Sequence, residues 1–166
     1  MKKEKETSEF LNLPDIEYFL FEEDFVEENV RCIPMIVRFK MDKAGIKLKL
    51  AEWSKFRIEE RVELAKKECS NEVEAKEYNN YLSNLIEKYT AKPATALEVD
   101  MKPVWAGINS VPQILNDKLN EFGWHVSTEQ WKGLTNLQRF ALLKLCREGH
   151  ENKNLPKAMK EFKLID

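Results

Sequence analysis

The sequence is poor in the residues that mark several common protein classes. Only five of its 166 residues are glycine and six are proline, which argues against collagen-like, linker-rich or turn-dense β architectures. Its longest unbroken apolar runs are a few residues long, so no segment can span a bilayer. Acidic residues follow Lys2, Lys3 and Lys5 at once, and no apolar signal core appears there. We therefore expect a cytoplasmic protein with no membrane partner.

Cysteine and histidine are also scarce. The three cysteines, Cys32, Cys69 and Cys146, are odd in number and far apart, which predicts reduced thiols without a disulfide. Two histidines, His125 and His150, are too few for a histidine-rich metal site. Cys146 and His150 are four residues apart, but a glycine separates them and no other ligand has a suitable spacing. We predict no metal and no cofactor.

Apolar and charged residues are abundant, at 43% and 34% of the chain, and this balance predicts a real core under a charged surface. Residues 1–30 hold ten acids and three lysines, a balance of −7, so a net charge of −2 leaves +5 for residues 31–166. Residues 31–68 alone contain eleven Lys and Arg against six Asp and Glu. A nucleic-acid partner would need a denser basic stripe with interleaved aromatic residues, so we expect none.

An internal repeat with an offset of 78 positions relates residues 34–64 to residues 112–142. Seven of the 31 aligned positions are identical, compared with about two expected by chance. The identical pairs are Pro34/Pro112, Ile36/Ile114, Lys40/Lys118, Gly45/Gly123, Trp53/Trp131, Arg61/Arg139 and Leu64/Leu142. Because tryptophan and glycine are uncommon here and both align, the sequence predicts two copies of one supersecondary unit.

Capping residues and glycines set the elements predicted for each copy. In the second copy, Ser110 with Gln113 forms a capping box for a first helix, and Thr135 with Gln138 forms another. A last short helix is expected from Asn154 on. The first copy is predicted to hold helices near 33–44 and 58–69, a longer helix from Asn71 to about Tyr89, and a link over 46–50 for which a short strand is an alternative.

The predicted fold is a single all-α domain, residues 1–166, built from two copies of a helix-turn-helix-helix unit. Its parts are an acidic N-terminal arm (1–30), the first copy (31–91), a connecting loop (92–105) and the second copy (106–166). Each copy has too few apolar residues to fold securely alone, so we expect the two copies to share one core.

Residues that recur in both copies are expected to serve as scaffold, because a catalytic site is seldom needed twice. We predict that each repeated tryptophan packs under a helix turn and that each repeated arginine bonds helix-end carbonyl groups. The acidic cluster over residues 22–28 is expected to be a solvated face beside Phe19 and Phe21, which belong to the core or to a docking edge. With no nucleophile elbow, phosphate-binding glycine loop or metal motif in the sequence, we expect no enzyme.

A dense pattern of characteristic residues lies between Phe19 and Trp53. It consists of Phe19, Phe21, Glu22, Asp24, Phe25, Arg31, Cys32, Ile33, Pro34, Met35, Arg38, Lys40, Asp42, Gly45, Ile46, Lys47, Leu48 and Trp53. This pattern resembles the nitrate reductase-associated proteins, which are small helical proteins best known in cyanobacteria. The resemblance implies an accessory role in producing active assimilatory nitrate reductase, and it implies no set of catalytic residues.

Within this pattern we expect a basic, thiol-bearing patch beside the acidic arm to bind a partner. Its candidate residues are Glu22, Asp24, Arg31, Cys32, Arg38, Lys40 and Lys47. A reductase subunit, or the phosphate and pterin of a molybdenum cofactor in transit, would suit such cations. For Lys40, which recurs as Lys118, we favour a solvent-facing position on a capped helix.

The leading hypothesis is a non-catalytic accessory protein that binds an enzyme partner. The alternative is a small-molecule or cofactor carrier with a pocket between the two copies, lined by tryptophan, tyrosine and arginine. An enzyme that uses Cys32 or the carboxylates of residues 22–28 is a third hypothesis. A flat patch around residues 31–47 would favour the docking protein, whereas a deep apolar pocket would favour the carrier.

Overall fold

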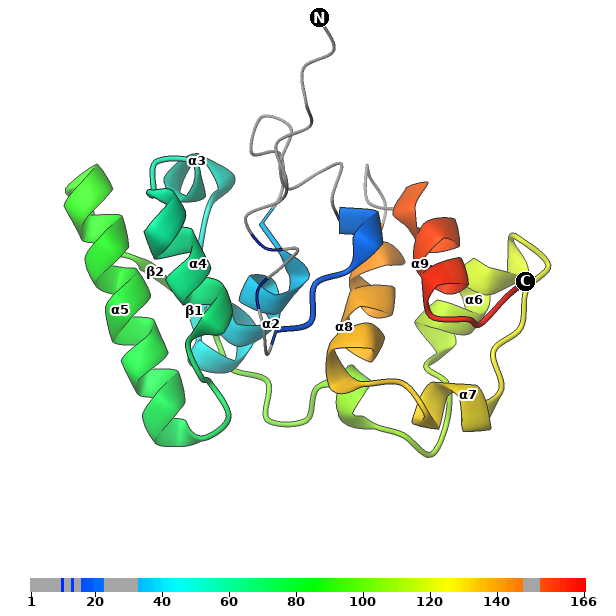
Figure 1. Ribbon diagram of the computed structural model, residues 1–166. Helices are drawn as coiled ribbons and strands as arrows, with labels where there is room; N and C mark the ends of the chain where they lie inside the picture. Colours follow the sequence, from blue (N-terminus) through cyan, green and yellow to red (C-terminus); the bar gives the residue numbers. More distant parts are fainter. Residues whose placement is uncertain (1–9, 11–12, 14–15, 23–32, 148–152) are drawn as a thin grey trace, which may run out of the picture. The chain divides into compact units, whose positions relative to one another are not determined.

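The computed structural model describes residues 10, 13, 16–22, 33–147 and 153–166 (Figure 1). This part of the chain is mainly helical, as the all-α prediction requires, and it contains one small sheet of two strands. The chain divides into two compact units. Unit 1 comprises Met1–Tyr18 and Glu22–Asp100, and unit 2 comprises Phe19–Phe21 and Met101–Asp166. The core that we expected both copies to share stays a prediction.

Unit 1 contains four α-helices and both strands among its described residues. These are α2 (Met35–Ala44), β1 (Ile46–Lys47), α3 (Leu50–Trp53), α4 (Ile58–Lys66), α5 (Glu72–Thr90) and β2 (Thr95–Ala96). The two strands pair antiparallel, with Ile46 opposite Ala96 and Lys47 opposite Thr95. A strand was the alternative for residues 46–50, whereas its partner lies in the predicted connecting loop, where no strand was expected.

The core of unit 1 forms where α5 packs against α2 and α3, and where α2 packs against α4. Its fully buried members include Val37, Trp53, Leu64, Leu82 and Ile86. They come from α2, α3, α4 and α5, so each helix contributes one apolar face. Asn71 caps α5 by accepting a hydrogen bond from the backbone N of Glu74 at 2.9 Å, as predicted.

Unit 2 is built around α8, which packs against α6, α9 and the 3₁₀ turn η2. Its elements are η2 (Val104–Ala106), α6 (Gln113–Asn120), α7 (Thr128–Lys132), α8 (Asn136–Leu145) and α9 (Leu155–Glu161). The 3₁₀ turn η1 (Leu20–Glu22) adds Phe21 to this unit. Phe19 and Phe21 pack on Phe162 with ring centroids 4.9 and 6.1 Å apart, which places both phenylalanines in the core.

The first three helices of the two units follow each other in the register that the sequence repeat predicts. Helices α2, α3 and α4 begin at residues 35, 50 and 58, and α6, α7 and α8 begin 78 positions later, at 113, 128 and 136. Pro34 and Pro112 precede α2 and α6 with nearly equal φ values of −56° and −58°. Gly45 and Gly123 both have φ of 70°. Superposition of the two backbones, and their origin by duplication, stay predictions.

A tryptophan and an arginine pack together in the same way inside each unit. Trp53 and Trp131 are completely buried. The guanidinium carbon of Arg61 lies 5.9 Å from the ring centroid of Trp53, and that of Arg139 lies 5.9 Å from the ring of Trp131. An arginine at this distance over an indole face is attracted by the ring quadrupole. We call each such pair a Trp–Arg pair.

Each arginine also bonds the carbonyl oxygen that ends the preceding helical turn. Arg61 donates from Nε and Nη2 to the carbonyl oxygen of Phe56, at 3.2 and 3.1 Å. Arg139 donates from Nη1 to the carbonyl oxygen of Leu134, which aligns with Phe56, and from Nε to that of Trp105 at 2.8 Å. The predicted role of the repeated arginines is confirmed. Because guanidinium donors are fixed in a plane, these bonds set the angle between the turn and the next helix.

The two buried indole N–H groups differ in their partners. Trp131 Nε1 donates to the carbonyl oxygen of Gly107 at 2.7 Å, whereas Trp53 Nε1 has no acceptor among the described residues. Gly107 follows η2, so the turn that packs on α8 also satisfies the indole. The buried donor of Trp53 carries a desolvation cost that Trp131 avoids.

One predicted capping box is wrong, and a serine capping box that was not predicted lies at the start of α7. Helix α6 begins at Gln113 with Pro112 at its N-cap and without a side-chain cap, so Ser110 lies outside the helix. Proline already fixes the backbone that enters the helix, and the Gln113 side chain donates to Asp117 at 2.6 Å instead. The box of Thr135 with Gln138 is confirmed. The serine capping box of α7 is that of Ser127 with Gln130.

Replacing the two aligned glycines with alanine should have unequal effects. A Cβ at Gly123 would meet no atom within 4 Å, so Gly123→Ala should cost about 1–2 kcal/mol, from the left-handed backbone alone. A Cβ at Gly45 would lie 2.9 Å from Val99 Cγ2 and 3.0 Å from the carbonyl oxygen of Leu97. Gly45→Ala should cost roughly 1–3 kcal/mol more. Urea denaturation of both variants measures this difference, and equal losses would contradict it.

Replacing the two buried tryptophans with phenylalanine should also have unequal effects. Trp131→Phe removes a hydrogen bond and leaves the carbonyl oxygen of Gly107 without its donor, whereas Trp53→Phe removes a donor that has no acceptor. Both changes remove similar volume, so the hydrogen bond should make Trp131→Phe more destabilising by about 1–3 kcal/mol. Thermal and chemical denaturation check the order, and a larger loss for Trp53→Phe would contradict it.

Candidate functional site

Four of the seven predicted partner-binding residues lie in the described part of the chain. These are Glu22, Arg38, Lys40 and Lys47. Asp24, Arg31 and Cys32 lie outside the described residues.

Glu22 is a buried helix cap. Its side chain is 4% exposed, and its Oε1 accepts a hydrogen bond from the backbone N of Met35 at 2.6 Å, in the first turn of α2. The N-cap residue Pro34 offers no side-chain oxygen, so a carboxylate from thirteen positions away satisfies this donor. The solvated face expected for residues 22–28 is therefore wrong at Glu22.

Lys40 forms hydrogen bonds with the C-terminal end of α4. Its Nζ donates to the carbonyl oxygens of Ala65 and Lys67, both at 2.7 Å, where α4 ends. A cation at this place satisfies carbonyl groups that have no partner within the helix. Burial lowers the pKa of Lys40. The solvent-facing position that we favoured for Lys40 is wrong, and its aligned residue Lys118 pairs with Glu121 at 2.9 Å.

Arg38 and Lys47 differ in how far they are presented to solvent. Arg38 is half-buried, and its Nη1 lies 3.8 Å from Met35 Sδ on the same helix. Lys47 is exposed on β1, opposite Thr95 of β2. Among the described candidate cations, Lys47 is therefore the one whose side chain is exposed to solvent.

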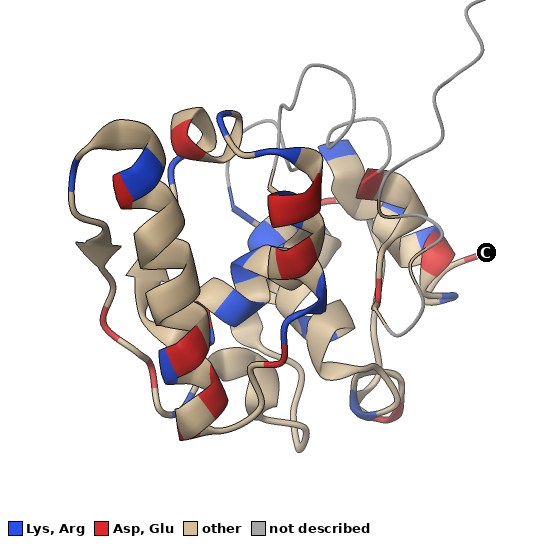
Figure 2. Ribbon diagram, turned by 60° about the vertical axis from the view of Figure 1, so that its left-hand side comes forward, with Lys and Arg blue, Asp and Glu red and all other residues tan. Residues whose placement is uncertain are grey.

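Three further lysines of unit 1 lie at the ends of α3 and α5. Figure 2 shows basic residues just before and just after α3 and just past the C-terminal end of α5. They are Lys49, Lys55 and Lys92, and together with Lys47 we call them the lysine edge. Sequence reasoning did not single out these three residues. The alternation of lysine and leucine over residues 47–50 indicated Lys49, whereas the fold brings Lys55 and Lys92 near it.

A hollow of about 250 Å³ lies within the lysine edge. It is lined by Lys49, Glu52, Lys55, Thr90, Lys92, Pro93 and Thr95. In the described part of the chain, no acidic side chain forms an ion pair with a lysine of this edge. Within the described residues, the lysine edge therefore presents positive charge that no ion pair neutralises, around a concave surface.

The backbone around the hollow is held by local hydrogen bonds. Glu52 Oε1 accepts from the backbone N of Lys49 at 2.8 Å, which fixes the start of α3. Ala91 ends α5 with φ of 56°, a left-handed turn that redirects the chain. Thr90 Oγ1 accepts from the backbone N of Lys92 at 3.2 Å and so fixes that turn. Lys49 and Lys92 thus start from ordered backbone.

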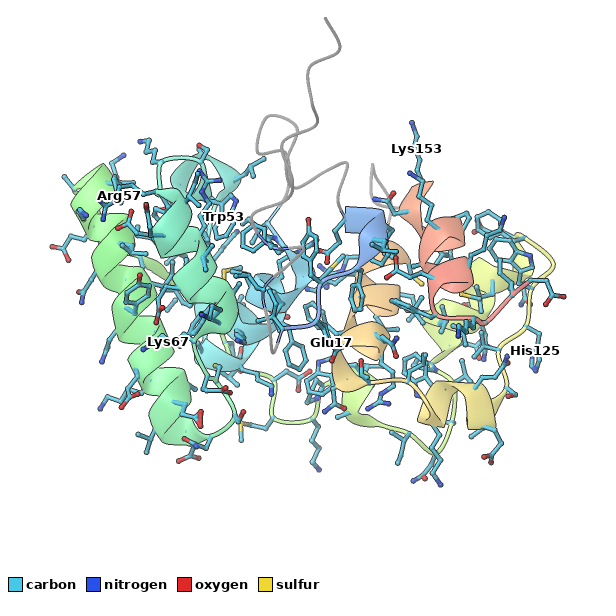
Figure 3. All side chains as sticks on the ribbon, in the orientation of Figure 1. Glu17, Trp53, Arg57, Lys67, His125 and Lys153 are labelled. Carbon is cyan, nitrogen blue, oxygen red and sulfur yellow. The ribbon has the colours of Figure 1, made fainter. Side chains whose placement is uncertain are left out.

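A second polar cluster surrounds Glu60, which is buried near the start of α4. Its carboxylate accepts hydrogen bonds from the backbone N of Arg57 at 2.9 Å, from Lys88 Nζ at 3.4 Å and from Tyr89 Oη. Arg57 lies just before α4 (Figure 3). Burial acts to raise the pKa of Glu60, but these three donors together lower it below its usual value. An acid held ionised in this way is a helix cap and a poor proton donor.

The described cysteines are buried and the described histidine is exposed. Cys69 and Cys146 are free, buried thiols. Burial raises the pKa of Cys69, and it raises the pKa of Cys146 to about 11, so both thiols stay protonated near neutral pH and are poor nucleophiles. His125 is exposed between α6 and α7 (Figure 3). No group of three or more His, Cys, Asp and Glu within the described ranges could hold a metal ion.

None of the helices in the described ranges is both long enough and apolar enough to cross a bilayer.

Comparison with known protein families identifies a match over most of the chain. The family model described as conserved nitrate reductase-associated protein matches residues 18–162, a range that includes residues of both units. The resemblance first seen between Phe19 and Trp53 therefore extends over most of the chain. No curated protein and no solved structure gives a significant match.

The buried carboxylate of Glu60 should make unit 1 sensitive to acid. Because the pKa of Glu60 is lower in the folded chain than in the unfolded chain, its stabilising contribution is complete above the unfolded value of about 4.3. That contribution is lost as the pH falls through the lower folded pKa. Glu60→Gln keeps an oxygen acceptor for Arg57 and does not titrate, so its stability should fall less steeply in acid. Urea midpoints measured from neutral to acidic pH test this, and parallel curves would contradict it.

Proposed function

The chain belongs to the conserved nitrate reductase-associated protein family, and on this premise we propose that it is a non-catalytic accessory protein. It binds an enzyme partner through protein contact and assists the assembly, maturation or activity of that enzyme. The family name suggests a nitrate reductase as the partner. The chemistry of unit 1 supports a docking role, and the surface that carries it is the lysine edge.

The unpaired charge of the lysine edge is the observation that supports docking. Four lysines from the β1–β2 region, the ends of α3 and the end of α5 gather there without an acidic partner in the described chain. Such a surface attracts an acidic face of another protein, speeds encounter and sets orientation. The proposed partner therefore presents clustered carboxylates.

The contacts of the other candidate residues support placing the docking surface at the lysine edge. Glu22 and Lys40 are used at the ends of α2 and α4, so their charges serve the fold. Asp24, Arg31 and Cys32 stay candidates for partner binding on sequence grounds. Arg38 lies in the first half of α2 and also stays a candidate for partner binding on sequence grounds.

The state of the buried polar groups supports a non-catalytic role. Cys69 and Cys146 are protonated thiols within the core, and the carboxylate of Glu60 has donors on its oxygens from Arg57, Lys88 and Tyr89. A nucleophile or general acid needs access to a substrate and a pKa suited to proton transfer. These groups offer neither.

Removing the lysine edge should weaken partner binding without unfolding the chain. In a variant with alanine at Lys47, Lys49, Lys55 and Lys92, we expect at least a tenfold loss of affinity for a purified nitrate reductase, because interfacial charges that become desolvated contribute about 2–5 kcal/mol. Each exposed lysine should change the unfolding free energy by no more than about 0.5 kcal/mol. Co-purification and titration at two salt concentrations measure binding, which should also fall for wild type as salt rises.

The matched control replaces four exposed lysines elsewhere, Lys66, Lys76, Lys132 and Lys153. It removes the same formal charge and should bind the reductase like wild type. A lysine-edge variant that melts normally and still captures the reductase would show that this surface is merely solvated. Equal weakening by both variants would show an effect of net charge and no docking surface.

A further inference from the structure

The hollow in the lysine edge has the composition of an anion-binding site. Three of its seven lining residues are lysines, two are threonines and one is a glutamate, and Pro93 is the remaining member. Lysine is a common ligand of phosphate groups, to which it contributes a point charge and up to three donors. Pro93 is the one apolar residue in this lining, and the aliphatic stems of the lysines add further apolar surface beside the charged groups.

We propose that the hollow binds a phosphate-class oxyanion carried by a small molecule. The site goes beyond the accessory role proposed above, because it is formed within unit 1 and requires no protein partner. Lys49, Lys55 and Lys92 are its charged ligands, and Thr95 contributes a hydroxyl from β2.

The size of the hollow favours a small ligand. Its volume of about 250 Å³ lies just below the roughly 300–1,000 Å³ of drug-sized ligand pockets. A protein partner instead covers about 800 Å² of surface and needs an extended patch around such a hollow. A phosphate group with a short organic body fits the hollow itself.

The balance of charge around the hollow predicts selectivity for multiply charged anions. Glu52 lines the hollow, so three positive side chains face one negative side chain there. The C-terminal end of α5 also brings partial negative charge close to Thr90. A monoanion such as nitrate gains little from this balance, whereas a phosphate dianion or a pyrophosphate gains from each lysine.

Isothermal titration of the full chain at constant ionic strength tests the site with four probes, which are pyrophosphate, glycerol 3-phosphate, inorganic phosphate and nitrate. Pyrophosphate and glycerol 3-phosphate should bind saturably with one site per chain, and nitrate should not. Equal affinity for inorganic phosphate and glycerol 3-phosphate would show that free phosphate is sufficient, which would contradict the proposal that the oxyanion belongs to a larger small molecule. Tighter binding of glycerol 3-phosphate than of inorganic phosphate would show that the hollow also binds the organic part of the ligand, as proposed.

Variants should move the affinity in opposite directions. Alanine at Lys49, Lys55 and Lys92 should weaken pyrophosphate binding at least tenfold, since each bond to a charged group contributes a measurable share of affinity. Glu52→Gln removes a repelling charge, keeps an oxygen acceptor for the start of α3, and should tighten binding several-fold. Thr95→Val conserves shape at an exposed strand position and should weaken binding a few-fold with an unchanged melting temperature.

The control is alanine at Lys66, Lys76 and Lys132, which should leave pyrophosphate affinity unchanged. Absence of saturable pyrophosphate binding at millimolar concentration would overturn the proposal, and so would equal weakening by the control. If the triple-lysine variant fails to fold, the opposite shifts of Glu52→Gln and Thr95→Val still decide the matter. Loss of reductase capture in the lysine-edge variant without pyrophosphate binding to wild type would reject this site and leave the accessory role standing.

Discussion

The contact between a buried tryptophan and an arginine organises the helical turns of both units. In each unit the arginine lies over the indole and bonds the carbonyl oxygen that ends the turn before the next helix. The pair therefore fixes three things at once: the burial of a large ring, the end of a short helix and the direction of the following one. The helices that frame the core of unit 1 and the lysines around α3 both depend on this geometry.

Charged residues in unit 1 fall into two groups with different tasks. Glu22 and Lys40 reach across long sequence distances to satisfy backbone groups at helix ends, and Glu60 caps the helix in which it lies. A buried helix end without such partners would leave polar groups unsatisfied. The lysine edge does no such work and has no acidic partner in the described chain. Unit 1 thus uses some of its charged residues to satisfy helix ends, and the proposed docking surface consists of others.

Local sequence signals predicted the longer helices, the burial of the repeated tryptophans and the carbonyl bonds of the repeated arginines, because caps, glycines and aligned repeats act over a few residues. These signals did not predict the short helices α3 and α7 or the contact of each arginine with its indole. They could not predict contacts between distant segments. The strand partner of Ile46 lies 50 positions away, and Lys40 finds its acceptors at residues 65 and 67. The lysine edge was found only in part for the same reason, since Lys92 meets Lys49 and Lys55 through the turn after α5. Nothing in the spacing of these residues reveals that proximity.

The β1–β2 ribbon has a consequence for solubility. A sheet edge presents backbone groups that can pair with the edge of another molecule and so begin aggregation. Here each strand has two residues, and the exposed side chain of β1 is Lys47. A short edge that carries a lysine is a poor template for a second strand, because pairing would bring two like charges together. The surface that we assign to recognition therefore also keeps copies of this chain from joining edge to edge.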